Sequence, residues 1–109
     1  MNDKFKIIIM IKKLISDYDM IIFNSKKELN VKDMILSEIY DILKTTYIAN
    51  GIYDKDKKKK LQIDILARFK YLEYLTTKLN IPDKEVNTFL YKINMIEKYI
   101  QNWIKYTSK

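Results

Sequence analysis

Glycine and proline are almost absent from this sequence of 109 residues, which contains one of each. Tight hairpin turns draw heavily on these two residues, so a sheet of β-hairpins is hard to build from this chain. Residues such as Leu, Ile, Lys, Glu and Met instead recur at helical spacing. We therefore expect an all-α protein in which residues 1–109 form a single domain around one core.

Four segments carry apolar side chains at intervals of three and four residues, which places these side chains along one side of a helix. The predicted helices cover residues 3–23, 31–50 and about 61–80, and a fourth opens at Pro82. Short connections between them favour an antiparallel up-and-down four-helix bundle. The core residues expected from the first three helices are Phe5, Ile7, Ile8, Ile11, Leu14, Ile15, Tyr18, Ile21, Ile22, Ile35, Ile39, Ile42, Leu43, Ala49, Leu61, Ile65, Phe69, Leu72, Thr76 and Leu79.

The fourth helix has the most regular apolar pattern. Its apolar residues repeat at intervals of three, four, three, four and three, which is the a/d seam of a coiled coil. Trp103 closes this seam, and a tryptophan there is expected to fill the core rather than to stack on a nucleic-acid base. The seam residues are Val86, Phe89, Ile93, Ile96, Ile100 and Trp103.

The positive charge of the chain lies in its second half. Residues 1–54 contain eight lysines and eight acids, whereas residues 55–109 contain twelve lysines, Arg68 and six acids, a net charge of +7. A basic surface typically meets a polyanion, because each Lys or Arg releases a counterion from it. Solubility is the simpler alternative, and the lysine run at 57–60 also fits a solvated loop. The candidate contacts for RNA, single-stranded DNA or another partner are Lys57, Lys58, Lys59, Lys60, Arg68, Lys70, Lys78, Lys98 and Lys105.

Apolar and aromatic residues also fall on the sides of the third and fourth helices that face away from the predicted core. A solvated helix face needs neither kind of residue, which favours a surface that faces nucleic acid or is covered by a second copy of the chain. Single tyrosines are also common on protein surfaces, so simple tolerance is the alternative. The candidate oligomer contacts are Ile63, Tyr71, Tyr74, Tyr91 and Met95.

Residues suited to catalysis or metal binding are scarce in this sequence. The chain has no histidine and no cysteine, which excludes imidazole acid–base chemistry, thiol nucleophiles, disulfides and the usual zinc and iron–sulfur sites. Asp54, Asp56 and Asp64 fit no metal-ligand spacing, and the sequence holds neither a Gly-rich phosphate loop nor a nucleophile–base pair. We expect a protein that is not an enzyme and that takes no cofactor, metal or small-molecule substrate.

The apolar run at residues 7–11 is too short to span a bilayer. It is five residues long and is followed by Lys12 and Lys13, without the small-residue cleavage site of an export signal. The expectation is a soluble cytoplasmic protein with no membrane partner.

The second half of the chain resembles a known protein family. Residues 60–64 (Lys-Leu-Gln-Ile-Asp), residues 68–70 (Arg-Phe-Lys) and the ending at 96–105 are similar to the accessory variability determinant (Avd) proteins of diversity-generating retroelements. That family typically ends in I-G-R-M-L-G-G-W-I-K. Lys98 stands at the arginine position, and residues 101–102 (Gln-Asn) replace the paired glycines. The matching residues are Ile96, Trp103, Ile104 and Lys105.

The resemblance implies a four-helix bundle that assembles into a homopentameric barrel and binds a reverse transcriptase together with RNA or cDNA. Such a protein supports mutagenic cDNA synthesis without being catalytic itself. A sister family shares the fold, namely the bundle proteins encoded in intervening sequences of bacterial 23S ribosomal RNA genes. The alternative is therefore an oligomeric scaffold that binds protein or RNA and has no link to a reverse transcriptase.

Overall fold

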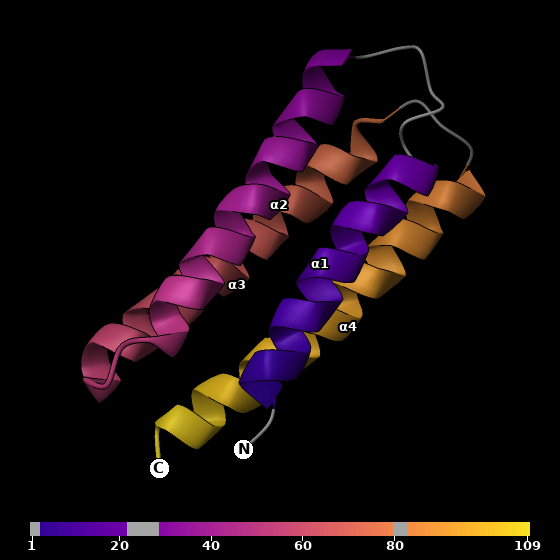
Figure 1. Cartoon of the computed structure of the whole chain (residues 1–109). Helices are drawn as coiled ribbons and strands as arrows, with labels where there is room; N and C mark the ends of the chain where they lie inside the picture. The colour runs from indigo at the N-terminus through magenta and orange to yellow at the C-terminus, as the bar shows by residue number, and fades with distance from the viewer. Residues whose placement is uncertain (1–2, 22–28, 80–82) are drawn as a thin grey trace.

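The computed structural model describes residues 3–21, 29–79 and 83–109, and these form four α-helices that pack against one another (Figure 1). The helices are α1 (Asp3–Ile21), α2 (Leu29–Asn50), α3 (Lys55–Thr77) and α4 (Asp83–Thr107). No β-strand occurs within the described ranges. The predictions of an all-α chain and of a four-helix bundle are confirmed.

Each helix of the bundle contacts two neighbours. α1 packs against α2 and α4, and α3 packs against the same two helices, while the described backbone shows no contact across either diagonal. The result is a square bundle that measures 45 × 21 × 19 Å. Figure 1 shows that the start of α1, the end of α4 and the turn between α2 and α3 lie at the same end of the bundle.

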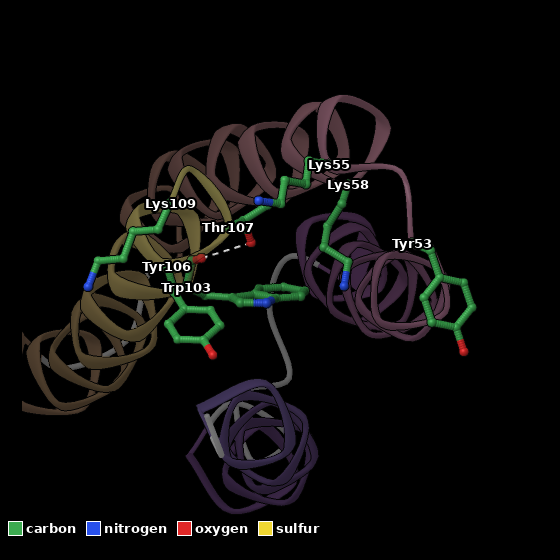
Figure 2. Close-up of a pocket in the computed structure, with 7 residues that line it drawn as sticks. All are labelled: Tyr53, Lys55, Lys58, Trp103, Tyr106, Thr107 and Lys109. Carbon is green, nitrogen blue, oxygen red and sulfur yellow. Dashed lines mark hydrogen bonds between the residues drawn. The ribbon is translucent and has the colours of Figure 1, made fainter.

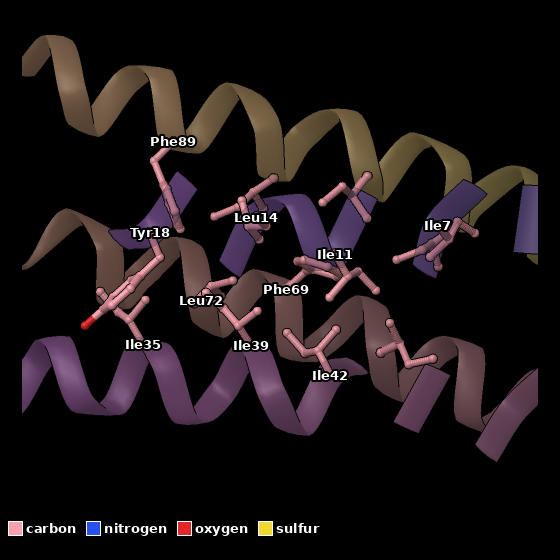
Figure 3. Close-up of a cluster of buried hydrophobic side chains, with 14 of the residues drawn as sticks. Ile7, Ile11, Leu14, Tyr18, Ile35, Ile39, Ile42, Phe69, Leu72 and Phe89 are labelled. Carbon is pink, nitrogen blue, oxygen red and sulfur yellow. The ribbon is translucent and has the colours of Figure 1, made fainter. Parts of the chain in front are cut away.

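The core is a continuous cluster of aliphatic and aromatic side chains that point inward from all four helices (Figure 3). Burial of such side chains contributes about 1.5–3 kcal/mol each to folding, so this cluster is the main source of stability. The predicted seam of α4 lies in it, except that Val86 is only half-buried. The cluster comprises Ile7, Ile11, Leu14, Tyr18, Ile35, Ile39, Ile42, Ala49, Ile65, Phe69, Leu72, Leu75, Leu79, Phe89, Ile93, Ile96, Ile100 and Trp103.

The core-facing side of α1 differs from the predicted one. Phe5 and Ile7 were both expected in the core, but Phe5 is 59% exposed and only Ile7 is fully buried. The isoleucine run at residues 7–9 offers apolar side chains in several directions, so the spacing alone does not decide which of them face inward. Ile22, Phe23 and Pro82, which the predicted helix pattern also uses, lie outside the described residues.

The third helix begins earlier than its apolar pattern predicts. α3 starts at Lys55, so the lysine run at residues 57–60 is helical and not a loop. Asp54 caps this end, because the backbone N–H of Lys57 donates a hydrogen bond of 3.0 Å to its Oδ1. The carboxylate of Asp56 lies in the first turn. The two acids offset the unfavourable placement of lysines at the positive end of the helix dipole.

Buried polar side chains join neighbouring helices near the two ends of the bundle. The Tyr18 hydroxyl of α1 donates to the Lys32 backbone carbonyl of α2 at 2.9 Å. At the opposite end, the Gln62 amide of α3 donates to the Thr107 hydroxyl of α4 at 2.8 Å. Because both bonds are shielded from water, removing one partner would leave the other unsatisfied in the core.

Candidate nucleic-acid interface

The start of α3 and the end of α4 lie together and form the most basic part of the described structure. The buried hydrogen bond between Gln62 and Thr107 fixes these two segments against each other. We call this region the lysine-rich end. It consists of residues 54–60 and 105–109, which contain Lys55, Lys57, Lys58, Lys59, Lys60, Lys105 and Lys109.

Few acids compensate the charge of the lysine-rich end. It contains seven lysines and only two acids, Asp54 and Asp56, which gives a net charge of +5. The Asp54 carboxylate is held by the backbone of α3 as its N-terminal cap. Within the described residues none of the seven ammonium groups forms an ion pair. Such groups remain available for phosphate oxygens.

Arg68 and Lys70 form ion pairs with acidic side chains of the bundle, unlike the lysines at its end. The Arg68 guanidinium donates to Asp64 Oδ2 at 3.0 Å and lies 3.3 Å from Glu38 Oε1 on α2. The hydrogen bond with Asp64 is the main reason why the pKa of Arg68 is raised. Both residues were predicted to contact nucleic acid, and in the structure each one joins α3 to a neighbouring helix.

Glu97 on α4 is a buried carboxylate that sequence reasoning missed. It is 3% exposed, and the Lys70 ammonium group lies 2.7 Å from its Oε2. The pKa of Glu97 is raised from 4.5 to about 7, first by burial and then by the neighbouring Glu73 carboxylate, while Lys70 opposes the shift. The hydrogen bond with Glu97 raises the pKa of Lys70 in turn. This cluster ties α3 to α4, but it leaves Lys70 little freedom to bind a partner.

The two remaining predicted basic residues lie away from the lysine-rich end. Lys78 is the C-cap residue of α3, and its ammonium group sits 5.1 Å from the centre of the Tyr74 ring. Lys98 is exposed on α4, about two helical turns before Lys105. The structure therefore brings the lysine run and Lys105 together. Of the other predicted contacts, Arg68 and Lys70 form ion pairs within the bundle, and Lys78 and Lys98 lie elsewhere on its surface.

A pocket of about 520 Å³ opens at the lysine-rich end (Figure 2). Trp103 forms part of it and is 2% exposed, which fits its predicted place at the end of the core seam. Figure 2 shows the indole ring reaching from α4 across the end of the bundle. The pocket combines three lysines, three aromatic residues and a threonine, namely Lys55, Lys58, Lys109, Tyr53, Trp103, Tyr106 and Thr107.

The predicted contacts did not include Lys55, Lys109, Tyr53 or Tyr106. The signal for Lys55 and Lys109 was their position next to other lysines in the basic half of the chain. Tyr53 belongs to the α2–α3 connection and is 99% exposed, so no periodic pattern marks it. Only the pairing of α3 with α4 brings these residues to one pocket.

Comparisons with models of protein families, with characterised proteins and with solved structures yield no match to this chain. In the part of the chain that the structure describes, no three Asp or Glu side chains gather closely enough to hold a metal ion. None of the described helices combines the length and the apolar content needed to cross a membrane.

The predicted oligomer contacts fall into two groups. Met95 is half-buried in a groove between α1 and α4, beside an ion pair of 2.7 Å between Lys92 and Asp17. Its side chain is less exposed than we expected from the sequence, because it lies against α1. The other four residues are exposed, and they are Ile63, Tyr71, Tyr74 and Tyr91.

Proposed function

We propose that the lysine-rich end binds RNA or single-stranded DNA and that the protein is a non-catalytic accessory subunit of a nucleic-acid enzyme. The observation that carries this proposal is the convergence of unpaired lysines from two segments of the chain into one region of net charge +5. Closely spaced ammonium groups favour polyanions, because each phosphate that they neutralise releases a condensed counterion. The absence of histidine and cysteine from the sequence is in keeping with a binding role.

The enzyme that we propose as partner is the reverse transcriptase of a diversity-generating retroelement. This part of the proposal rests on the resemblance of residues 96–105 to the ending of the Avd family. Lys105 belongs both to that ending and to the lysine-rich end. In this role the bundle holds template RNA or cDNA near the polymerase during mutagenic cDNA synthesis, in the cytoplasm.

The bundle that we propose has an antiparallel up-and-down topology. Two buried hydrogen bonds support it, because each joins the end of one helix to the start of a neighbour. Tyr18 near the end of α1 bonds to Lys32 near the start of α2. Gln62 near the start of α3 bonds to Thr107 at the end of α4.

We also propose that the bundles assemble, with a pentamer as the expected form. Ile63, Tyr71 and Tyr74 are exposed on α3, and exposed aromatic residues that recur along one helix typically mark a contact surface. The pentamer itself rests on the Avd resemblance. Light scattering should report the oligomer, and Tyr74→Glu should dissociate it while helicity is retained. A wild-type monomer at micromolar concentration would contradict this part of the proposal.

The same exposed residues favour a second candidate function. A bundle whose α3 surface binds only protein would be an oligomeric scaffold of the type encoded in 23S ribosomal RNA intervening sequences. The scaffold and the nucleic-acid subunit differ in one measurable property, namely salt-dependent affinity for nucleic acid. A scaffold would assemble normally and show no such affinity.

Fluorescence anisotropy with a labelled single-stranded oligonucleotide tests the primary function. We expect the logarithm of affinity to fall linearly with the logarithm of salt concentration. The triple substitution Lys57→Gln, Lys60→Gln and Lys105→Gln should weaken binding and lower the salt slope by about 0.7 for each lysine removed. All three side chains are exposed, so the fold should tolerate the change.

The matched control removes the same net charge from α1 and α2 through Lys12→Gln, Lys13→Gln and Lys44→Gln, which are also exposed. This variant should keep the wild-type salt slope. Equal losses in both triple variants would show that net charge acts without a defined site. If the wild-type protein has no affinity for RNA or single-stranded DNA, the scaffold function replaces the nucleic-acid function.

A further inference from the structure

The pocket at the lysine-rich end has the composition of a site for a single nucleotide. Its volume of about 520 Å³ lies within the range of about 300–1,000 Å³ that is usual for small-ligand sites. Trp103 and Tyr106 give it flat apolar surfaces, and Tyr53 lies exposed at its edge. Lys55, Lys58 and Lys109 contribute three ammonium groups. Figure 2 shows these side chains coming from the start of α3, the end of α4 and the residues just before α3.

The indole of Trp103 gives the pocket an unused hydrogen-bond donor. The residue is 2% exposed, yet its indole N–H meets no acceptor among the described residues. Its backbone carbonyl accepts from the Thr107 hydroxyl at 3.0 Å, so only the side chain is unpartnered. The indole nitrogen is not sealed from solvent, so a water molecule or a ligand can reach it. An acceptor atom of a ligand in the pocket would pair with this donor.

The three ammonium groups of the pocket are not neutralised by the protein. Lys55, Lys58 and Lys109 form no ion pair within the described residues. Asp54 and Asp56 flank Lys55 in sequence, but Asp54 is occupied as the cap of α3 and Asp56 forms no ion pair with these lysines within the described residues. Three lysines around one small pocket exceed what the single charge of an internal phosphodiester requires. A terminal phosphate monoester carries a charge of about −1.5 to −2 at neutral pH and matches them better.

We infer that this pocket binds the phosphorylated terminal nucleotide of a single-stranded nucleic acid. The base stacks on the Tyr106 ring and accepts from the Trp103 indole, while the terminal phosphate lies among Lys55, Lys58 and Lys109. Stacking on an aromatic side chain contributes about 1–3 kcal/mol per base and tolerates any sequence. The rest of the strand then continues over the outward-facing lysines, which include Lys57 and Lys60. This inference rests on the proposed function and adds recognition of a strand end to it.

The only tryptophan of the chain makes occupancy of this pocket measurable without a label. Three oligonucleotides of the same sequence serve as probes, one with a 5′-phosphate, one with a 3′-phosphate and one with hydroxyl groups at both ends. A phosphorylated form should change the fluorescence of Trp103 and bind about tenfold or more tightly than the hydroxyl form, as expected for added charge-assisted hydrogen bonds. The two phosphorylated forms distinguish which strand end is recognised.

Lys58→Gln and Tyr106→Ala should each abolish the preference for a terminal phosphate while salt-dependent binding of all three probes persists. The matched controls are Lys44→Gln and Tyr91→Ala, which remove an exposed lysine and an exposed tyrosine elsewhere and should keep the preference. Equal affinity of the wild-type protein for all three probes would overturn this inference and leave the proposed function standing. Absence of binding to every probe would overturn both.

Discussion

The buried carboxylate of Glu97 predicts an unusual dependence of stability on pH. Its pKa is raised from 4.5 to about 7, because burial between α3 and α4 disfavours the charged form and the Glu73 carboxylate adds repulsion. The folded protein therefore holds a proton that the unfolded chain releases. Stability from this group is fully present below about pH 4.5 and is lost as pH rises through about 7.

The size of the effect follows from the shift. One pKa unit corresponds to about 1.4 kcal/mol, so a rise from 4.5 to about 7 allows a change of at most about 3.5 kcal/mol in the free energy of unfolding. This limit assumes that Glu97 alone takes the proton, and sharing with Glu73 reduces it. Because the chain contains no histidine or cysteine, few other side chains titrate in the same window.

Urea denaturation between about pH 5 and 7 measures the effect. The wild-type free energy of unfolding should fall as pH rises, whereas Glu97→Gln, which cannot ionise, should show little slope. At about pH 8 the variant should be the more stable protein, since the Lys70 ammonium group is mostly exposed and can be solvated when its partner is lost.

Asp41→Asn, which removes an exposed carboxylate of α2, is the control and should keep the wild-type slope. A wild-type stability that is flat or rises across this window would refute the reasoning. So would a slope in Glu97→Gln equal to that of the wild type.

Four further substitutions test the fold by thermal or denaturant unfolding. Asp54→Ala removes the cap of α3 and should cost about 1 kcal/mol. Ile7→Ala should cost about 2–5 kcal/mol because Ile7 is fully buried, while Ile9→Ala should change stability by no more than about 0.5 kcal/mol. Similar costs for the two isoleucines would contradict the register of α1. Tyr18→Phe should cost about 1 kcal/mol through the lost bond to the Lys32 carbonyl, and an unchanged stability would show that water replaces it.

The helical periodicity of the sequence was sufficient to predict the bundle and most of its core. It worked best for α4, where the predicted seam residues Phe89, Ile93 and Ile96 are all buried. It failed for Phe5, because the neighbouring isoleucines allow more than one inward side. It also missed the start of α3, where Asp54 supplies a capping signal that apolar spacing does not include.

The candidate site was only partly predictable. The lysine run and Lys105 were visible as charge, but the pocket depends on which helix ends meet. The same holds for Glu97, which lies next to Ile96 on the edge of the buried side of α4 and becomes buried only because α3 packs over it. A single sequence reports the spacing along each helix, whereas the partners across an interface come from the packed structure.

The packing of the helices also makes the distribution of charge over the bundle asymmetric. α1 and α2 together are neutral, while α3 and α4 carry net charges of +4 and +1 and lie against each other. The field of a nearby polyanion therefore exerts a torque that turns the α3–α4 side toward it before any contact forms. The Debye length is about 10 Å at 0.1 M salt, roughly half the width of the bundle. At higher ionic strength the approaching molecule tumbles freely, and productive encounters become rarer even though every contact residue is unchanged.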